Sequence, residues 1–592
     1  MTNGVFEKEG SQMKKKRTLK SSQIDALPVV NAYIQDCNLF GIFAQFVPAG
    51  PHEKVSPATV LLFLLRNIIL SGFPLYKLPE WGRNYIPALL GITSEGLDVL
   101  NDDRIGRCLD DFFLADRSTI TTMIALQVIK QYQVKTDFCH NDSTTVTFQG
   151  AYHQKPKFNK KPVALLHGFN KDHRPDLKQL IFNLVISADG SVPIHYKLYD
   201  GNVTDDQTHR ETWDALRSLI GKPDFIYVAD SKLCTTDNMA YIDGQGGKFI
   251  TVLPRTRKEY QEFIRWVQEH PVCGQALWYR SASSRNGQAT DHYRGYEVSH
   301  SLAKEGYRLI WIHSAQKQKL DAEKRKGQIQ KVQCCLREVS AKLNKYSLKK
   351  KMAIRTRIEK ILNENNMQDC FTYEIKTFRQ RSKKGITRGR PGVNTTYRYT
   401  TQFYYELDWS VNQEVVKKKA NADGFFPLIT NIKQLSMVVI FKHYKYQPYI
   451  EKRHTYLKSV LEVAPVYLKT PERIEALLFL YYISLIIYAL IERDLRKTME
   501  KTGIKSIPIY PEQRECRRPS AERILGAFEK ISRHELWEND RLEETFFDSI
   551  GDIQLTILKL LRIPVSYYDK ESNKNFSADE KNSCHFKKIV VN

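Results

Sequence analysis

The chain has 592 residues, too many for one hydrophobic core, so we expect about three to five domains or large insertions. Its hydrophobic content of 42% excludes a wholly disordered protein. The 90 Lys and Arg residues against 66 Asp and Glu residues predict a polyanionic partner, for which nucleic acid is the commonest choice and a membrane surface the alternative.

The cysteines and apolar segments favour a cytoplasmic protein. The 10 cysteines form no C-x-x-C pair and no His/Cys block at zinc spacing, so we interpret them as reduced thiols. The first 20 residues are charged without an apolar stretch behind them, unlike a secretory signal. The most apolar run, Ala476 to Ile491, is short for a membrane span and predicts a buried helix, so we expect no membrane partner.

A basic flexible tail is expected over residues 1–23, and helical periodicity then dominates residues 24–133. Apolar stripes such as ATVLLFLLRNIIL alternate with turns that contain Pro or Gly, and LNDDRIGRCLDDFF indicates a loop leading into a helix. A helical domain in a basic protein fits a DNA-recognition module and a plain bundle equally well, because the sequence identifies no recognition helix.

The pattern changes to strands at Val134. VKTDFCHNDSTTVTF predicts one strand, and LKQLIFNLVISADGSVPIHYKLYDGN predicts two strands joined by a turn at Asp189-Gly190. After a helix that ends at Gly221, DFIYVAD and KFITVLP are typical of buried strands, with another short helix between them. This order predicts a mixed α/β sheet.

The alternation is lost over residues 256–425, which suggests an inserted domain. A helical hairpin with coiled-coil spacing is predicted there, and its seam is core packing first and a dimer interface second: Ile329, Val332, Leu336, Val339 and Leu343. The segment KTFRQRSKKGITRGRPGVNTTYR then carries eight Lys or Arg and no acid, which predicts a basic loop or arm. Within it, Arg388 and Arg390 belong to an RGRPG sequence similar to an AT-hook core, with a generic phosphate-binding loop as the equal alternative.

Two aspartates, Asp142 and Asp230, come where predicted strands end. Each alone is more commonly a turn former or cap than a metal ligand. If the two strands are neighbours, however, both carboxylates lie at one edge of the sheet, where open α/β sheets place their sites. Carboxylates are hard oxygen donors, which suit Mg²⁺ or Mn²⁺.

A third acid, Glu451, lies in HYKYQPYIEKRHTYLK. Pro448 is best tolerated in the first turn of a helix, so we expect a helix that starts near Gln447 or Pro448 and places Glu451 at the positive end of its dipole. Lys458, two turns further on, is expected on the same face and within reach of a DNA phosphate. Glu462 is the reserve acid.

The spacing of Tyr444, Gln447, Glu451 and Lys458 resembles Y-x2-R-x3-E-x6-K, the signature around the third acid of DDE transposases of the insertion-sequence-four superfamily. Gln447 stands where Arg is usual. The two Asp blocks of this family are resembled by HNDSTTVTFQG and YVADSKL. Adjoining segments of the family are resembled by LYDGNVTDDQT and DGFFPLIT, and the N-terminal domain of one subgroup is resembled by LNDDRIGRCLDDFF. Their order between Leu100 and Lys458 is more specific than any single block.

The resemblance implies an RNase H-like fold with a large insertion between Asp230 and Glu451. It implies that Asp142, Asp230 and Glu451 hold two Mg²⁺ (or Mn²⁺) ions, roughly 3.5–4 Å apart. It also implies that the signature residues Tyr444, Gln447 and Lys458 contact DNA, although Gln447 lacks the usual charge. Lys232 is a further DNA contact or, equally, a solvated lysine.

These features predict the transposase of a bacterial insertion sequence, cytoplasmic and associated with the nucleoid. We expect it to bind terminal inverted repeats and target DNA as a homodimer and to catalyse DNA strand cleavage and transfer. The alternatives are an RNase H-like nuclease without strand transfer and a non-catalytic DNA-binding derivative.

The expected domains are the tail (1–23), the helical N-terminal domain (24–133), the first part of the catalytic core (134–255), the insertion (256–425), the second part of the core (426–500) and a C-terminal helical region (501–592).

Overall fold

The computed structural model describes residues 17–150, 152, 157–169, 174–270, 274–280, 291–297, 303–386, 396–461 and 468–568. The chain forms two compact units. Unit 1 contains the segments up to Phe249 and from His443, and unit 2 contains Ile250–Lys442. The inserted unit is thus longer at both ends than the predicted 256–425.

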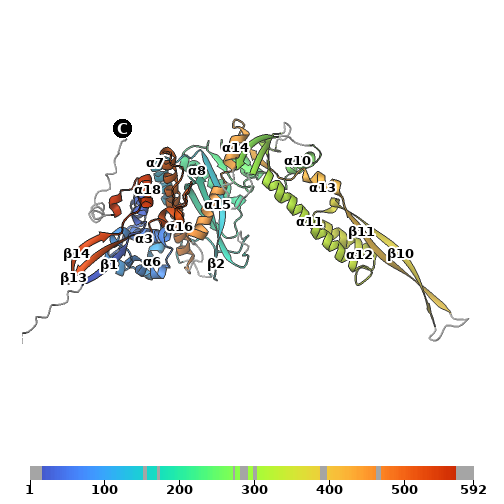
Figure 1. Ribbon diagram of the computed structural model, residues 1–592, viewed down its shortest axis with the longest axis horizontal. Coiled ribbons are helices and arrows are strands. Elements are labelled where there is room, and N and C mark those ends of the chain that lie inside the picture. The colour runs from blue at the N-terminus through green and yellow to red at the C-terminus, as the bar shows by residue number, and fades with distance from the viewer. Residues whose placement is uncertain are drawn as a thin grey trace, which may run out of the picture. The chain divides into compact units, whose positions relative to one another are not determined.

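Unit 1 combines many helices with five strands of a mixed sheet (Figure 1). Its strands follow the order β4-β3-β2-β5-β6, with β2 antiparallel to β3, β3 antiparallel to β4, and β2 parallel to β5. These strands are β2 Phe138–Phe148, β3 Lys178–Ser187, β4 Pro193–Asp200, β5 Ile226–Val228 and β6 Lys248–Val252. The predicted mixed α/β sheet is confirmed.

Most helices of unit 1 contribute side chains to one large hydrophobic core. Before the sheet lie α1 Leu27–Asp36, α2 Leu39–Phe46, α3 Pro57–Leu70, α4 Leu78–Arg83, α5 Ser94–Asp98, α6 Asp102–Leu114 and α7 Arg117–Tyr132. Within and after it lie α8 Asp205–Ile220, α9 Thr236–Gly244, α15 Pro448–Thr455, α16 Pro471–Lys501, α17 Ala521–Gly526 and α18 Asp552–Leu561.

Helix α16 is the centre of this core. All its residues from Ala476 to Arg493 are buried, and the helix packs against α3, α6, α18 and β4. By length and composition α16 is able to cross a membrane, as are the bent pairs α3 with α4 and α6 with α7, but 94% of the apolar window of α16 is buried inside the protein. The predicted buried helix is confirmed, and the N-terminal helices share its core instead of forming a separate domain.

The two ends of unit 1 meet in a small sheet that the sequence did not predict. β1 Arg17–Gln23 pairs with β13 Ser532–Glu538, which pairs with β14 Arg541–Phe547. The expectation of a flexible tail is therefore wrong for residues 17–23, and the expectation of an all-helical C-terminal region is wrong for this hairpin. The tail was not predicted as a strand because its partner β13 lies hundreds of residues away in sequence and leaves no local signal. The strands β13 and β14 are separated only by Asn539 and Asp540, so their hairpin is a local feature that the prediction missed.

Unit 2 has its own antiparallel strands, in the order β6-β12-β9-β8-β7. The end of β6 pairs with β12, which explains why the unit extends beyond the predicted insertion. Its elements are α10 Lys258–Glu269, β7 Gln275–Arg280, β8 Asp291–Tyr296, β9 Arg308–Ser314, α11 Ala315–Ala341, α12 Lys351–Glu364, β10 Phe371–Gly385, β11 Tyr397–Val411, α13 Gln413–Ala420, β12 Phe425–Thr430 and α14 Met437–Tyr444.

The predicted helical hairpin is confirmed as α11 and α12, whose seam is a buried core in which Val332, Leu336 and Val339 cluster with Ile354 and Ile358. The expected basic loop or arm is instead two long paired strands, β10 and β11. Their side chains are mostly exposed, so the apolar/polar alternation that identifies a half-buried strand is absent from most of their length.

Asp494 on α16 gives a pH-dependent prediction. Burial raises the pKa of this carboxyl to about 6, against the opposing effects of Arg493 and of the Tyr33 hydroxyl, which donates a hydrogen bond at 3.3 Å. A raised pKa means that the folded state binds the proton more tightly, so the stability contribution of Asp494 is lost as pH rises through about 6. We expect Asp494→Asn to increase the free energy of unfolding at neutral pH by about 1–2 kcal/mol.

That gain should shrink as the pH is lowered toward 4, because the wild-type carboxyl is then protonated as well. Urea unfolding at several pH values measures it. A gain independent of pH, or a loss at neutral pH, would contradict the assignment.

Candidate active site

Asp142 and Asp230 both follow the stretch in which β2 and β5 pair. The parallel pairing ends with His140 opposite Val228, and each aspartate comes two residues after this last pair. Asp142 lies within β2 with its side chain 19% exposed, and Asp230 is half-buried just beyond β5. The predicted adjacency of the two strands is confirmed, but the expectation that Asp142 comes at the end of its strand is wrong.

The carboxylate of Asp230 is oriented by the turn that follows it. Its Oδ1 accepts a hydrogen bond of 2.9 Å from the backbone N–H of Lys232, and its carbonyl accepts one of 3.2 Å from Leu233 N–H. Asp230 therefore does form a turn, the commoner role of such a residue, and this turn also fixes the direction of the carboxylate. The side chain of Lys232 is exposed, which suits either solvent or DNA.

Helix α15 starts as predicted, with Pro448 as its first residue and Glu451 exposed in its first turn. The pKa of Tyr444, a residue just before this helix, is affected by two of the acids. Burial, and then the negative charges of Asp230 and Glu451, raise the pKa of its hydroxyl to about 12. One turn after Glu451, His454 Nε2 lies 3.6 Å from Asp142 Oδ2. Tyr444 therefore lies near Asp230 and Glu451, and His454 lies beside Asp142.

Gln447 faces inward, which corrects the predicted DNA contact. Its Nε2 donates a hydrogen bond of 3.0 Å to the carbonyl of Asn141, and its Oε1 lies 3.1 Å from His140 Nδ1. Burial lowers the pKa of His140 to about 4, so the imidazole is neutral and Nδ1–H is the donor to Gln447. Both ends of the amide are thus occupied by β2, next to Asp142.

A buried arginine, Arg453, fixes the other side of α15. It is 2% exposed, and its guanidinium donates 3.0 Å and 3.1 Å hydrogen bonds to the carbonyls of Ser191 and Gly190 in the β3–β4 turn. It also lies 3.0 Å from Glu492 of α16, which is itself 1% exposed.

Glu492 has further partners in Arg496 at 3.3 Å and in the Tyr456 hydroxyl at 2.7 Å. Although burial opposes ionisation, Arg453, Arg496 and Tyr456 keep the pKa of Glu492 below its usual range. The sequence does not reveal this ion pair. Arg453 is one of several basic residues in its segment, and Glu492 is one of the charges that flank the apolar run.

Lys458 departs from the predicted geometry. α15 ends at Thr455, and residues Tyr456–Val460 form a π-helix, in which Leu461 N–H bonds the carbonyl of Tyr456. The wider turn rotates Lys458 away from the position that an α-helical period gives, so its shared face with Glu451 does not hold. Such π-turns are frequent at functional sites.

Three predicted residues, Arg388, Arg390 and Glu462, lie outside the described residues.

No group of three or more His, Cys, Asp or Glu side chains is placed to hold a metal ion among the residues that the structure describes. The chemistry of the donor set nevertheless fits Mg²⁺, because Asp142, Asp230 and Glu451 all offer hard oxygens. His454 beside Asp142 fits the role of a partner that orients a ligating carboxylate.

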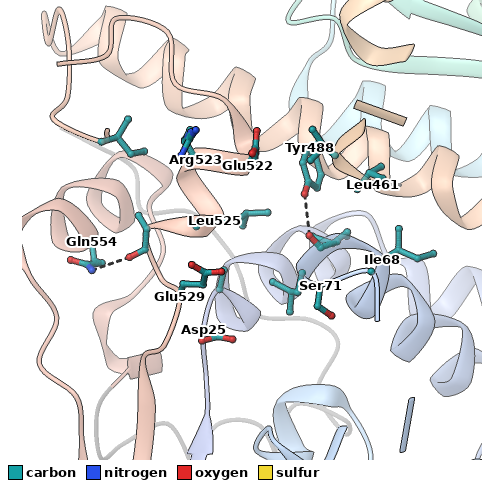
Figure 2. Close-up of a pocket in the computed structure, with 18 of the residues that line it drawn as sticks. Asp25, Ile68, Ser71, Leu461, Tyr488, Glu522, Arg523, Leu525, Glu529 and Gln554 are labelled. Carbon is teal, nitrogen blue, oxygen red and sulfur yellow. Dashed lines mark hydrogen bonds between the residues drawn. The ribbon is translucent and has the colours of Figure 1, made fainter. Parts of the chain in front are cut away.

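A cleft of about 700 Å³ lies elsewhere in unit 1 (Figure 2). Its lining includes Asp25, Glu522 and Glu529, and none of the three predicted catalytic acids. Asp25 is already bonded by the Tyr85 hydroxyl at 2.9 Å and by Lys530 N–H at 2.8 Å. The acidic groups in this lining are unfavourable for a polyanion, so we do not place DNA there.

Comparison with known proteins gives partial likenesses. A family model described as Domain of unknown function (DUF4277) matches residues 19–126, which cover β1 and the helices up to α7. The comparison with curated proteins found no match. The solved structures that are similar include a cryo-EM structure of the piggyBac transposase synaptic complex with hairpin DNA, at 8% identity over 95% of this chain and 87% of that chain, with a TM-score of 0.38. These likenesses do not place the whole chain in a family.

The role of Gln447 can be tested by Gln447→Leu. This change leaves the carbonyl of Asn141 and the Nδ1–H of His140 without partners, and we expect it to lower the free energy of unfolding by about 1–3 kcal/mol. Gln447→Glu keeps the acceptor for His140 and should lie between Leu and wild type. A Gln447→Leu protein with unchanged stability but weaker DNA binding would return this residue to the DNA interface.

The buried ion pair gives an asymmetric prediction. Glu492→Gln leaves Arg453 buried without its counter-charge and should cost about 3–5 kcal/mol of unfolding free energy. Arg453→Met should cost less, because Arg496 still neutralises Glu492. In a double-mutant cycle of these changes measured by urea unfolding, the two costs should not add; strict additivity would show that the pair does not couple α15 to α16.

Proposed function

We propose that this protein is a DDE transposase of a bacterial insertion sequence, which cleaves and joins DNA through Asp142, Asp230 and Glu451. The observation that carries the proposal is the parallel pairing of β2 with β5, because Asp142 and Asp230 each follow its last pair, His140 with Val228, by two residues. Gln447 docks the helix of Glu451 on β2 one residue before Asp142. The resemblance of the surrounding sequence to the transposase signature adds the assignment of roles.

The RNase H-like fold is part of this proposal. It is supported by the antiparallel meander of β2, β3 and β4, followed by β5 and β6 after the helices α8 and α9. Asp142 then lies within β2, Asp230 lies just beyond the end of the neighbouring β5, and Glu451 lies on a helix packed against β2 and β3.

The three acids would hold two Mg²⁺ (or Mn²⁺) ions, which when bound activate the attacking oxygen and stabilise the leaving one. The turn at Lys232 holds the carboxylate of Asp230 in one direction, and His454 lies beside that of Asp142. Glu451 is exposed in the first turn of α15, and we assign it as the acid that would complete the site.

The proposed partner is double-stranded DNA, both the inverted repeats at the element's ends and the target, bound by a homodimer. The formal charge of +24 supports a polyanionic partner. Tyr444, Lys458 and Lys232 remain the proposed contacts near the cleaved end, while Gln447 does not.

Glu451→Gln tests the proposal. We expect it to reduce Mg²⁺-dependent cleavage of DNA carrying the terminal repeats by at least about 1,000-fold, because an amide is a poor ligand for a hard cation. Binding to the same DNA should stay within about threefold, since one exposed charge changes. Glu414→Gln is the matched control, because Glu414 is also exposed in the first turn of a helix, α13. A fully active Glu451→Gln protein would refute the assignment.

The absence of a gathered metal group among the described residues favours one alternative, a non-catalytic DNA-binding derivative. That alternative predicts salt-sensitive DNA binding without any Mg²⁺-dependent cleavage. An RNase H-like nuclease would instead cleave, yet give no joined product when pre-cleaved ends are incubated with a target plasmid.

A further inference from the structure

Strands β10 and β11 of unit 2 form a two-stranded ribbon. They pair without interruption from Phe371 opposite Val411 to Gly385 opposite Tyr397. With 15 residues in each strand and about 3.4 Å per residue, the ribbon extends for roughly 50 Å. In Figure 1 it continues, in yellow, past the hairpin of α11 and α12.

The base of the ribbon is anchored on that helical hairpin. Phe371, Ile375 and Leu407 belong to the same buried cluster as the α11–α12 seam. Asn344 is bonded to the backbone of Tyr405 in both directions, accepting from its N–H at 2.8 Å and donating to its carbonyl at 3.0 Å. The part of the ribbon beyond Thr377 therefore extends from a base that is fixed on the helical hairpin.

The face of the ribbon that carries the buried apolar side chains at the base becomes basic and aromatic further out. Successive side chains of a strand alternate between faces, so Arg379, Arg381 and Lys383 lie on one face. The residues paired with them on β11 are Phe403, Thr401 and Tyr399. No acid occurs at these six positions, and Phe403 and Tyr399 are each 55% exposed.

The cations on this face lie close to aromatic rings of the same face. The Arg381 guanidinium lies 4.4 Å from the centroid of the Tyr399 ring, and Lys383 Nζ lies 4.9 Å from that of Tyr397. These contacts hold the cations in a row along the ribbon. They also cover ring faces that would otherwise be available to stack on unpaired bases.

The opposite face differs in charge. It carries Glu374 and Glu406 as well as Lys376, which pairs with Asp408. Its remaining cations are Lys384 and Arg398, which are paired across the strands. The acids of this face lie at the base of the ribbon, so they offset Lys376 but not Lys384 and Arg398.

We propose that the face of Arg379, Arg381 and Lys383 is a docking surface for duplex DNA, with the ribbon lying in the major groove and the cations contacting phosphates. The major groove is about 12 Å wide and admits a two-stranded β-ribbon. Cations on every second residue repeat at about 6.8 Å, close to twice the 3.4 Å rise per phosphate of one DNA strand. The inference deepens the proposed function, on which its choice of DNA as the polyanion rests.

The test compares two triple variants of the full-length chain. Arg379→Gln/Arg381→Gln/Lys383→Gln removes three cations from the docking face, and Lys376→Gln/Lys384→Gln/Arg398→Gln removes three from the opposite face. All six side chains are exposed, so both variants should unfold at the wild-type urea concentration. Binding to a random-sequence duplex of about 30 base pairs is measured without metal over a range of NaCl concentrations.

We expect the docking-face variant to bind at least tenfold more weakly at about 0.1 M salt, and its slope of log K against log salt to shrink by about 2–3, at about 0.9 per phosphate contact. The opposite-face variant should lose less than threefold. Equal losses in both variants, or no loss in either, would overturn the proposal. So would tighter binding to single-stranded DNA of the same length, or a loss seen only on vesicles of anionic phospholipid.

The same proteins separate this inference from the proposed function. If the wild type shows Glu451-dependent cleavage while the docking-face variant binds like wild type, the docking surface is wrong and the transposase assignment stands. If the docking-face variant alone loses binding but no Glu451-dependent cleavage is found, the docking surface stands and the transposase assignment is wrong.

Discussion

The arrangement of the candidate site depends on one buried ion pair, Arg453 with Glu492. A buried guanidinium is tolerated when its charge and most of its N–H groups have partners. Here the partners of Nε and Nη2 come from two distant segments, the β3–β4 turn and α16, while Nη1 has no hydrogen-bond partner among the described residues. These partners fix the rotation of α15 about its axis. Glu451 precedes Arg453 by two residues, about 200° around an α-helix, and so lies on the face opposite the buried pair.

The β2-facing side of α15 is set by the same rotation. Gln447 and His454 lie four residues before and three residues after Glu451, so all three occupy one face of the helix. Gln447 bonds β2 at Asn141 and His454 lies beside Asp142, which places Glu451 between two contacts to the strand of the first aspartate. A second ionic contact, from Arg493 and Lys497 of α16 to Asp189, holds the β3–β4 turn on which Arg453 depends.

Local patterns in the sequence predicted the parts of this site that local chemistry determines. The strand before Asp230 was visible as an apolar run, and Pro448 marked a helix start because its ring fixes φ and lacks an N–H. Most partners of Gln447 and Arg453 were not predictable, because they lie on β2 or in the β3–β4 turn, hundreds of residues away in sequence. The pairing of β1 with β13 was not predictable for the same reason, and no local signal marked the π-turn at Lys458.

Gln447 is the departure from the transposase signature, and its surroundings explain why a neutral residue is suited there. The neighbouring buried groups are uncharged: His140 has a pKa of about 4, and Asn141 lies 3.4 Å from His209 Nδ1, which also contacts the Tyr227 hydroxyl at 3.1 Å. A guanidinium at position 447 would have no carboxylate among these partners. The amide of Gln447, in contrast, satisfies one donor and one acceptor at once. In the proposed transposase, this departure replaces a charge at the signature position with a neutral contact to β2, and the contacts with DNA phosphates are assigned to cations elsewhere in the chain.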